Sequence, residues 1–360
     1  MTADSTKIQG DLTRTAVVLF NLGGPDRPDA VQPFLFNLFY DRAIIDLPNP
    51  VRWLVATMAS RRRAPAARLN YAKMGGSSPL LAGTREQAKA LQALLSPNGP
   101  VHVFIAMRYW RPFARDVAHE VKKWEPDRII LLPLYPQFSS TTAGSSLKNW
   151  AEAAGAEGLN VPTRTICCYP TEAGLVEAHT GLIRHALAEA KKFGRPRLLF
   201  SAHGLPEKIV AAGDPYQWQI EQTAAAVAAA VEQTPEGADL DWTVCYQSRV
   251  GPLKWIGPST EEEIVRAGKD RVPLVVCPIA FVSEHVETLV ELDIDFRERA
   301  EAVGVPAYIR VAAVGTEAPF IEGLAQLVRG AKPNTASATG GRLCPADRRR
   351  CICATGARAR

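Results

Sequence analysis

The sequence predicts an α/β protein made of two similar halves, each with a four-stranded parallel sheet flanked by helices, and an active-site cleft between the halves. Three observations predict this fold. Short apolar runs rich in Val, Ile and Leu alternate with longer helical patterns over the 360 residues. Most of these runs are continuous rather than alternating, which is typical of parallel strands covered on both faces. A turn rich in Gly and Pro follows an apolar run at 21–25 and again at 203–206, which indicates a repeated unit.

The elements are expected in regular alternation along the chain. Strands are expected at 16–20, 101–106, 129–134, 163–168, 198–201, 242–246, 274–279 and 307–311. The main helices are expected at 84–95, 174–192, 216–233, 261–267 and 286–303. We place the first half at 13–157, the second half at 158–311, a helix at 312–330 that returns to the first half, and a tail at 331–360.

The composition is that of an ordinary globular protein, with 47% hydrophobic and 22% charged residues. A net charge of +5 is too weak and dispersed to indicate nucleic-acid binding. The first fourteen residues lack the apolar core of a signal peptide, and no run of apolar residues is long enough to span a bilayer. Seven cysteines, an odd number that includes several in apolar strand patterns, favour a reduced cytoplasmic compartment.

The sequence Glu-His-Val-Glu at 284–287 follows an apolar strand and begins a helix. His285 with Glu284 and Glu287 suits a transient divalent metal site or a proton relay, because the pattern is not His-Glu-x-x-His. Glu291 and Asp295 follow Glu287 at i+4 and i+8, on one face of the expected helix. Like charges at this spacing disfavour a helix, so the acidic face indicates either a wet surface or a path for protons or metal ions.

His203 also ends a predicted strand, and Gly204 and Pro206 after it fix a turn that exposes the imidazole. Polar clusters follow six of the apolar runs, and the carboxyl ends of parallel strands form the ligand crevice in this class of fold. A single cluster would fit an ordinary polar loop, and a single histidine would fit a structural role. Six clusters containing His, Tyr, Arg and Glu favour an active site.

The segment 47–63 is amphiphilic, with Val51, Trp53, Leu54 and Met58 followed by three arginines. This pattern is typical of a surface helix that dips into an anionic bilayer. The alternative is a core helix whose last turn carries arginines that favour its dipole. The sequence leaves both open.

Together these residues resemble the ferrochelatase family, which inserts ferrous iron into a porphyrin, over most of the chain from Val17 to Val328. The motifs that carry the resemblance are Asn-Leu-Gly-Gly-Pro at 21–25, Gly-Gly-Ser-Ser-Pro at 75–79, Met-Arg-Tyr at 107–109, Tyr-Pro-Gln-Phe-Ser at 135–139, Ser-Ala-His-Gly-Leu-Pro at 201–206, Gln-Ser-Arg-Val-Gly-Pro at 247–252 with Trp255, and the acidic sequence at 284–293. The family fold consists of two flavodoxin-like or Rossmann-like halves.

The resemblance implies roles for individual residues. His203 matches the histidine that takes pyrrole protons or binds the metal, and Glu287 matches its partner carboxylate across the porphyrin, with His285 beside it. The expected metal ligands are His203, Glu284 and Glu287, and the expected acidic relay is Glu291 with Asp295. Porphyrin contacts are implied for Ile45, Arg108, Tyr109, Gln247, Ser248 and Trp255.

Cys344, Cys351 and Cys353 lie close together in the basic tail. An iron–sulfur cluster or a zinc site needs four ligands. Animal and some bacterial ferrochelatases are similar in carrying a [2Fe–2S] cluster on C-terminal cysteines plus one distant cysteine, so the resemblance implies such a bacterial member here. Unligated tail thiols are the alternative.

The chain departs from the animal pattern at the distant cysteine. Ser140 stands where the animal enzymes have that cysteine, and the C-terminal spacing also differs. The expected substitute is Cys167 or Cys168, because Cys245 and Cys277 fit core strands.

The resemblance implies that protoporphyrin IX and Fe²⁺ are the substrates of the terminal step of haem synthesis. Coproporphyrin or another metal is the alternative within the fold, and a porphyrin or haem carrier without catalysis is the alternative outside it. We expect a cytoplasmic protein whose 47–63 segment associates peripherally with the inner membrane. The preceding porphyrinogen oxidase and a second copy of the chain are the candidate protein partners.

Overall fold

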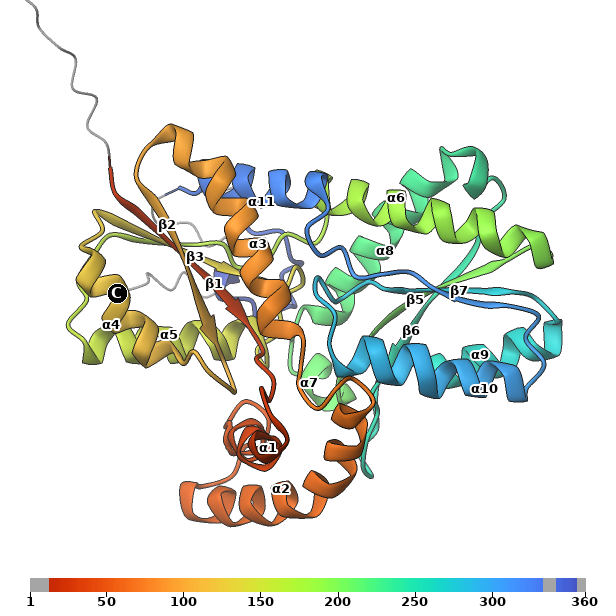
Figure 1. The fold of residues 1–360 in the computed structure, drawn as a ribbon, viewed down its shortest axis with the longest axis horizontal. Coiled ribbons are helices and arrows are strands. Elements are labelled where there is room, and N and C mark those ends of the chain that lie inside the picture. Colours follow the sequence, from red (N-terminus) through yellow and green to blue (C-terminus); the bar gives the residue numbers. More distant parts are fainter. Residues whose placement is uncertain (1–12, 333–340, 355–360) are drawn as a thin grey trace, which may run out of the picture.

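The computed structural model describes residues 13–332 and 341–354, and it contains two parallel sheets in two halves that lie side by side (Figure 1). The first sheet has the order β2-β1-β3-β4 and the second has the order β6-β5-β7-β8. The same order occurs twice, and every strand pair is parallel. The expected fold class is confirmed.

The strands follow the continuous apolar runs. Those of the first sheet are β1 (Thr15–Asn21), β2 (Val101–Met107), β3 (Arg128–Pro133) and β4 (Thr163–Thr165). Those of the second are β5 (Arg197–His203), β6 (Asp241–Gln247), β7 (Leu274–Pro278) and β8 (Tyr308–Arg310). The central strands β1, β5 and β7 are buried along nearly their whole length, as strands covered on both faces must be.

The first sheet extends beyond the expected boundary at residue 157. β4 pairs with β3, from Ile129 opposite Thr163 to Leu131 opposite Thr165. The boundary between the halves therefore lies after β4, because the chain completes its fourth parallel strand before it leaves the first sheet. β4 is also shorter than expected, so Cys167 and Cys168 lie in the loop that follows it.

Helices cover both faces of each sheet. In the first half these are α3 (Leu80–Leu95), α4 (Ala114–Trp124) and α5 (Ala143–Ala156), and in the second α6 (Ala173–Ala190), α8 (Tyr216–Glu232), α9 (Thr260–Asp270) and α10 (Phe296–Ala302). The last long helix, α11 (Ala318–Gly330), packs Phe320 and Leu324 into the same core as Leu91 of α3 and Val17 of β1. It thus lies on the first half and also contacts α6 (Figure 1).

Two helices, α1 (Val31–Tyr40) and α2 (Asn49–Ala72), project beyond the first sheet (Figure 1). The side chains of Val51, Trp53, Leu54 and Met58 on α2 are exposed, with Trp53 at 53% and Met58 at 64%. The core-helix interpretation of this segment is therefore wrong for these side chains. None of the helices in the described part of the chain is long and apolar enough to cross a bilayer.

The segment after β7 also differs from the expected α-helix. Glu287–Asp295, labelled η5, forms a π-helix, and only Phe296–Ala302 after it is α-helical. A π-helix bonds residue i to residue i+5, is rare, and is frequently found at functional sites. Apolar spacing alone does not distinguish it from an α-helix.

Candidate active site

The candidate site is centred on a contact between two of the predicted catalytic residues. His203 is the last residue of β5, and its Nδ1 lies 2.8 Å from Oε2 of Glu287 at the start of the π-helix. No macrocycle fits between atoms that touch, so the expected placement of Glu287 across the porphyrin from His203 is wrong. The two side chains form one hydrogen-bonded pair, and the His203 side chain remains 40% exposed.

The turn after His203 depends on close packing. A Cβ on Gly204 would lie 3.1 Å from the carbonyl oxygen of Gln247 and 3.3 Å from the ring of Trp255. Trp255, expected at the porphyrin edge, therefore packs over this turn and forms an isolated bridge with Pro206. Both distances are shorter than ordinary van der Waals contact, so a side chain at position 204 would require these neighbours to shift by a few tenths of an ångström.

The residues after β6 hold the acids in place. Ser248 Oγ lies 3.2 Å from Glu287 Oε2 and 2.5 Å from Glu291 Oε2, while the Ser248 backbone N–H donates to Glu291 Oε1 at 2.7 Å. Gln247 Nε2 donates to the Glu287 carbonyl and to Glu291 Oε2. Ser248 has a φ of 60°, in the left-handed region that is uncommon outside glycine. Gln247 and Ser248 thus orient the carboxylates.

The expected acidic relay is only partly assembled. Glu287 and Glu291 share the Ser248 hydroxyl, but the Asp295 carboxylate pairs with Lys73, just after α2. The buried end of the relay therefore contains two acids and the exposed end is an ion pair.

The charge states of the pair follow from its surroundings. Burial acts to lower the pKa of His203, but the charge of Glu287 and its hydrogen bond outweigh it, so the pKa of His203 is raised. Burial acts to raise the pKa of Glu287, but His203, His285 and Ser248 lower it to about 2. Burial and the charge of Glu287 raise the pKa of Glu291, which makes Glu291 the easier of the two acids to protonate.

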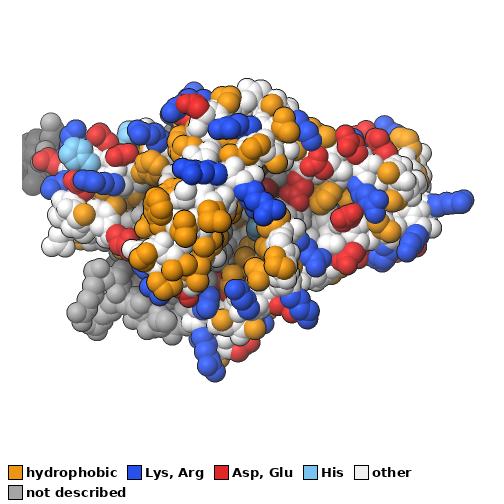
Figure 2. All heavy atoms as spheres, turned by 90° about the horizontal axis from the view of Figure 1, so that it is seen from below, with side chains coloured by type: hydrophobic (Ala, Val, Ile, Leu, Met, Phe, Trp, Pro, Cys, Tyr) orange, Lys and Arg blue, Asp and Glu red, His pale blue; other side chains and the backbone are white. Residues whose placement is uncertain are grey.

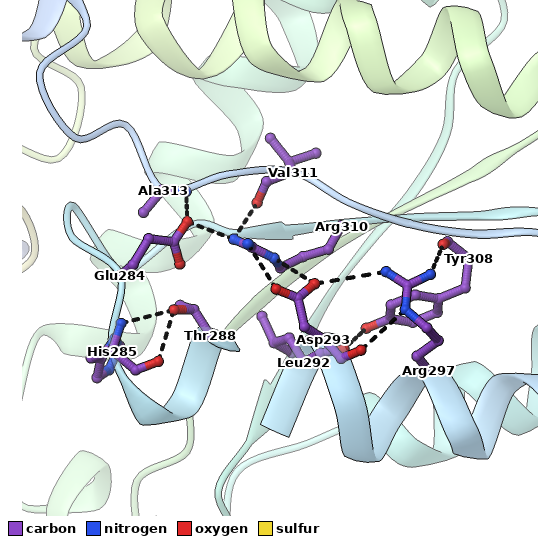
Figure 3. Close-up of polar contacts among 10 residues, drawn as sticks. All are labelled: Glu284, His285, Thr288, Leu292, Asp293, Arg297, Tyr308, Arg310, Val311 and Ala313. Carbon is purple, nitrogen blue, oxygen red and sulfur yellow. Dashed lines mark hydrogen bonds and ion pairs between the residues drawn. The ribbon is translucent and has the colours of Figure 1, made fainter. Parts of the chain in front are cut away.

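Glu284 does not join this pair, although we expected it as a metal ligand. Its Oε1 accepts from Arg310 Nη1 at 2.7 Å and from the Ala313 backbone N–H (Figure 3). Arg310 also pairs with Asp293 Oδ2 at 2.8 Å, so one arginine, 11% exposed, joins both ends of the segment 284–293. Glu284 lines a cavity of about 520 Å³ whose lining residues include neither His203 nor Glu287.

His285 is buried beside the pair. Its backbone N–H donates to Thr288 Oγ1 (Figure 3), its ring lies 4.6 Å from that of Phe281, and its Nδ1 has no hydrogen-bond partner. Burial lowers the pKa of His285, against the opposing charges of Glu287 and Glu284.

Across the residues that the structure describes, no three His, Cys, Asp or Glu side chains form a preformed metal site.

The predicted porphyrin contacts of the first half belong to a buried polar network. The Tyr109 hydroxyl donates to Asp41 Oδ2 at 2.7 Å, and Arg108 Nη2 pairs with the same oxygen at 2.9 Å. Arg108 Nε also donates to Ser145 Oγ at 2.7 Å. Ile45 is half-buried in the turn after α1, where its N–H donates to the Asp41 carbonyl. The Asp41 carboxylate therefore holds the side chains of Tyr109 and Arg108 in place.

Asp41 and two tyrosines near the catalytic pair were not predicted from the sequence. Tyr71 of α2 and Tyr216 at the start of α8 are both buried, and burial together with the Glu287 charge raises the pKa of Tyr71. Tyr216 reaches the backbone of His203. Both tyrosines lie in patterns that also suit core residues, so only the fold distinguishes them.

A second cluster contains five cysteines, which the fold brings together from two distant segments. Cys167 Sγ lies 3.3 Å from Cys168 Sγ and 3.3 Å from Cys353 Sγ. Cys351 interacts with the thiols of Cys167, Cys344 and Cys353, and those contacts lower its pKa. Both Cys167 and Cys168 are thus near the tail cysteines, whereas Cys245 and Cys277 are buried in strands as expected.

Comparisons with known proteins show the family of this chain. The chain is 54% identical over 352 residues to a protein named ferrochelatase from Caulobacter vibrioides (strain NA1000 / CB15N), covering 96% of this chain and 99% of the relative. It is 49% identical over 318 residues to a protein of that name from Pelagibacter ubique (strain HTCC1062), covering 88% and 90%. It shares the fold of a structure described as SirB from Bacillus subtilis with Fe3+, with a TM-score of 0.51 and 11% identity over 88% of this chain and 94% of that one. The family model described as Ferrochelatase matches residues 14–332, and the chain belongs to the ferrochelatase family.

Proposed function

We propose that this chain is an enzyme that inserts Fe²⁺ into protoporphyrin IX and releases two protons to form protohaem. The observation that carries the proposal is the contact between His203 and Glu287 at the carboxyl end of β5. Metal insertion requires a base for the pyrrole N–H protons and negative charge near the incoming cation. A porphyrin carrier needs neither.

The pair determines which nitrogen of His203 acts as the base. Because Glu287 is ionised, it favours the tautomer in which Nδ1 carries the proton and donates to Oε2. The lone pair of the neutral imidazole is then on Nε2, which accepts the pyrrole proton. Glu287 stabilises the resulting imidazolium, and Glu291, whose pKa is raised, can accept a proton from the pair in turn.

Removal of the base tests this proposal. We expect His203→Ala to abolish the loss of protoporphyrin fluorescence that follows anaerobic addition of Fe²⁺, while porphyrin binding stays detectable. His185→Ala is the matched control, because His185 is exposed on α6. Turnover in His203→Ala at the rate of the control would refute the proposal. Parallel assays with coproporphyrin test the alternative substrate, and the apolar surface of α2 favours the more apolar protoporphyrin.

We infer that the five-cysteine cluster, although it is not a preformed metal site among the described residues, holds a [2Fe–2S] cluster with Cys344, Cys351, Cys353 and Cys167 as ligands. Four thiolates are the ligand set that such clusters require, and the tail supplies only three. Cys167 is favoured over Cys168 because it interacts directly with both Cys351 and Cys353. A bound cluster would supply one-electron redox chemistry, and its ligands would fasten the tail to the loop after β4.

Visible absorption of the protein purified from iron-replete cells tests this inference. We expect a coloured protein whose absorption is lost in Cys167→Ser and kept in Cys168→Ser. A colourless, iron-free wild-type protein would exclude the cluster.

We infer that α2 contacts the cytoplasmic face of the inner membrane. Its exposed Val51, Trp53, Leu54 and Met58 lie one to three turns from the exposed arginines at 61–63. Figure 2 shows apolar side chains gathered on this face with basic side chains around them. Apolar side chains beside cations suit an anionic bilayer, from which an apolar porphyrin, supplied by a porphyrinogen oxidase, would enter the site.

A further inference from the structure

A buried glutamine faces the cysteine cluster from the second half of the protein. Gln219 lies in the first turn of α8 and has no exposed surface. Its Nε2 lies 3.1 Å from Cys344 Sγ and 3.4 Å from Cys168 Sγ. Its Oε1 accepts the Phe138 backbone N–H at 2.7 Å. Because a backbone N–H can only donate, this last bond fixes the amide with its NH₂ group toward the sulfurs.

The sulfur acceptors of the Gln219 amide indicate which charge state of the cysteines it suits. A buried amide must satisfy its donors, and a neutral thiol is a weak acceptor. A thiolate is negatively charged, and hydrogen bonds to charged acceptors are roughly twice as strong as those between neutral groups. The shorter of the two contacts is to Cys344, a proposed cluster ligand, whose sulfur would carry negative charge when it binds iron, whereas Cys168 is not in the proposed ligand set.

The surroundings of Gln219 hold it rigidly. Asp214, fully buried just before α8, accepts from the hydroxyls of Ser139 and Ser140 and from the Tyr216 backbone N–H. One turn further along α8, Thr223 Oγ1 accepts from Gln137 Nε2 at 3.0 Å. The segment 137–140 and the first two turns of α8 are thus locked together around the glutamine.

The tail also docks directly in front of α8. The Arg350 backbone N–H donates to the Gly213 carbonyl at 3.1 Å. Gly213 has a φ of 92°, and a Cβ there would lie 2.8 Å from the Arg349 backbone nitrogen. The chain before α8 is therefore shaped to accept the tail at close range, and this places Cys344 within reach of Gln219.

We propose that Gln219 is a positioning residue of the cysteine site, whose N–H···S bonds hold Cys344 and raise the reduction potential of the bound cluster. This inference rests on the cluster proposed above. Hydrogen bonds to ligand sulfurs stabilise the reduced form, which carries one more negative charge, and so raise the potential.

Two substitutions in the full-length, cluster-loaded protein test the inference. Gln219→Glu keeps the acceptor for the Phe138 N–H and replaces only the group that faces the sulfurs, and Gln219→Leu removes both. Gln222→Leu is the control, because Gln222 is half-buried on the same helix and is absent from the sulfur contacts of the described residues.

Anaerobic reductive titration followed by visible absorption is the measurement. We expect a lower midpoint potential in both Gln219 variants than in the wild type and in Gln222→Leu, and faster loss of absorption with an iron chelator. If Gln219→Leu fails to fold, Gln219→Glu alone decides. A coloured wild type with the same potential in the variants overturns this inference only, whereas a colourless wild type overturns the cluster itself.

Discussion

Lys73 Nζ lies 3.0 Å from Oδ1 of Asp295, and this ion pair joins the end of the projecting helix α2 to the end of the π-helix in the other half. Both side chains are partly exposed, so the pair contributes little to stability. Its consequence concerns charge, because Lys73 neutralises the outermost acid of the expected relay.

If Asp295 attracts the incoming cation, then Lys73 limits that attraction. We expect Lys73→Ala to lower KM for Fe²⁺ a few-fold and Asp295→Asn to remove this effect in the double variant. Lys89→Ala, at an exposed position on α3, is the control. Identical KM values in all variants would exclude Asp295 from iron delivery.

Ser248 is expected to contribute to catalysis through the two carboxylates that it holds. Its hydroxyl lies within hydrogen-bond distance of both Glu287 and Glu291, and hydrogen bonds to charged groups contribute about 1.5–3 kcal/mol. Ser248→Ala should lower kcat/KM by roughly 10-fold or more and leave porphyrin affinity unchanged. Steady-state kinetics beside Ser96→Ala, an exposed control, would show the difference, and an unchanged kcat/KM would contradict it.

The pH profile should depend on Glu287. The base must be neutral, and the pKa of His203 is raised above its ordinary value of about 6.5, so activity should increase with pH through a pKa above that value. Glu287→Gln removes the charge that raises this pKa and leaves the burial that lowers it. The acidic limb of kcat/KM should therefore move to lower pH while the maximum rate falls. If the acidic limb of the kcat/KM profile stays at the same pH, the group that titrates there is not His203.

Arg310 should be a major determinant of stability. Arg310→Met would leave Glu284 and Asp293 without their shared cation in a largely buried setting, which costs about 3–5 kcal/mol. Arg184→Met removes an arginine from a more exposed pair with Glu236 and should change the free energy of unfolding much less. Denaturant unfolding of both variants gives the comparison, and equal losses would argue against the importance of burial.

The exposed face of α2 should determine membrane binding. Burial of an apolar side chain of this size is worth about 1.5–3 kcal/mol, so Trp53→Ser with Met58→Ser should lower binding to phosphatidylglycerol vesicles by more than about 10-fold. Phe193→Ser, at an exposed apolar position outside α2, is the control. Sedimentation with vesicles measures the bound fraction, and equal binding by both variants would place the membrane contact elsewhere.

The strands were predictable because continuous apolar runs have few alternatives in a chain of this length. His203 and Glu287 were predictable as site residues because both follow such strands. The π-helix was not predictable, since acids four residues apart fit an α-helix equally well. The contact between His203 and Glu287 also depends on the register of β5 beside β6 and β7, which local patterns do not encode.

The sequence by itself determined the α/β class, the eight strands and the residue types of the site, because these depend on local periodicity and on motifs. Only the tertiary structure decided the partner of each charged group. Glu284 pairs with Arg310, Asp295 with Lys73, and Glu287 with His203, and each partner is distant in sequence. Buried charges adopt whichever opposite charge the fold brings nearest, and that distance exists only after the sheets have packed.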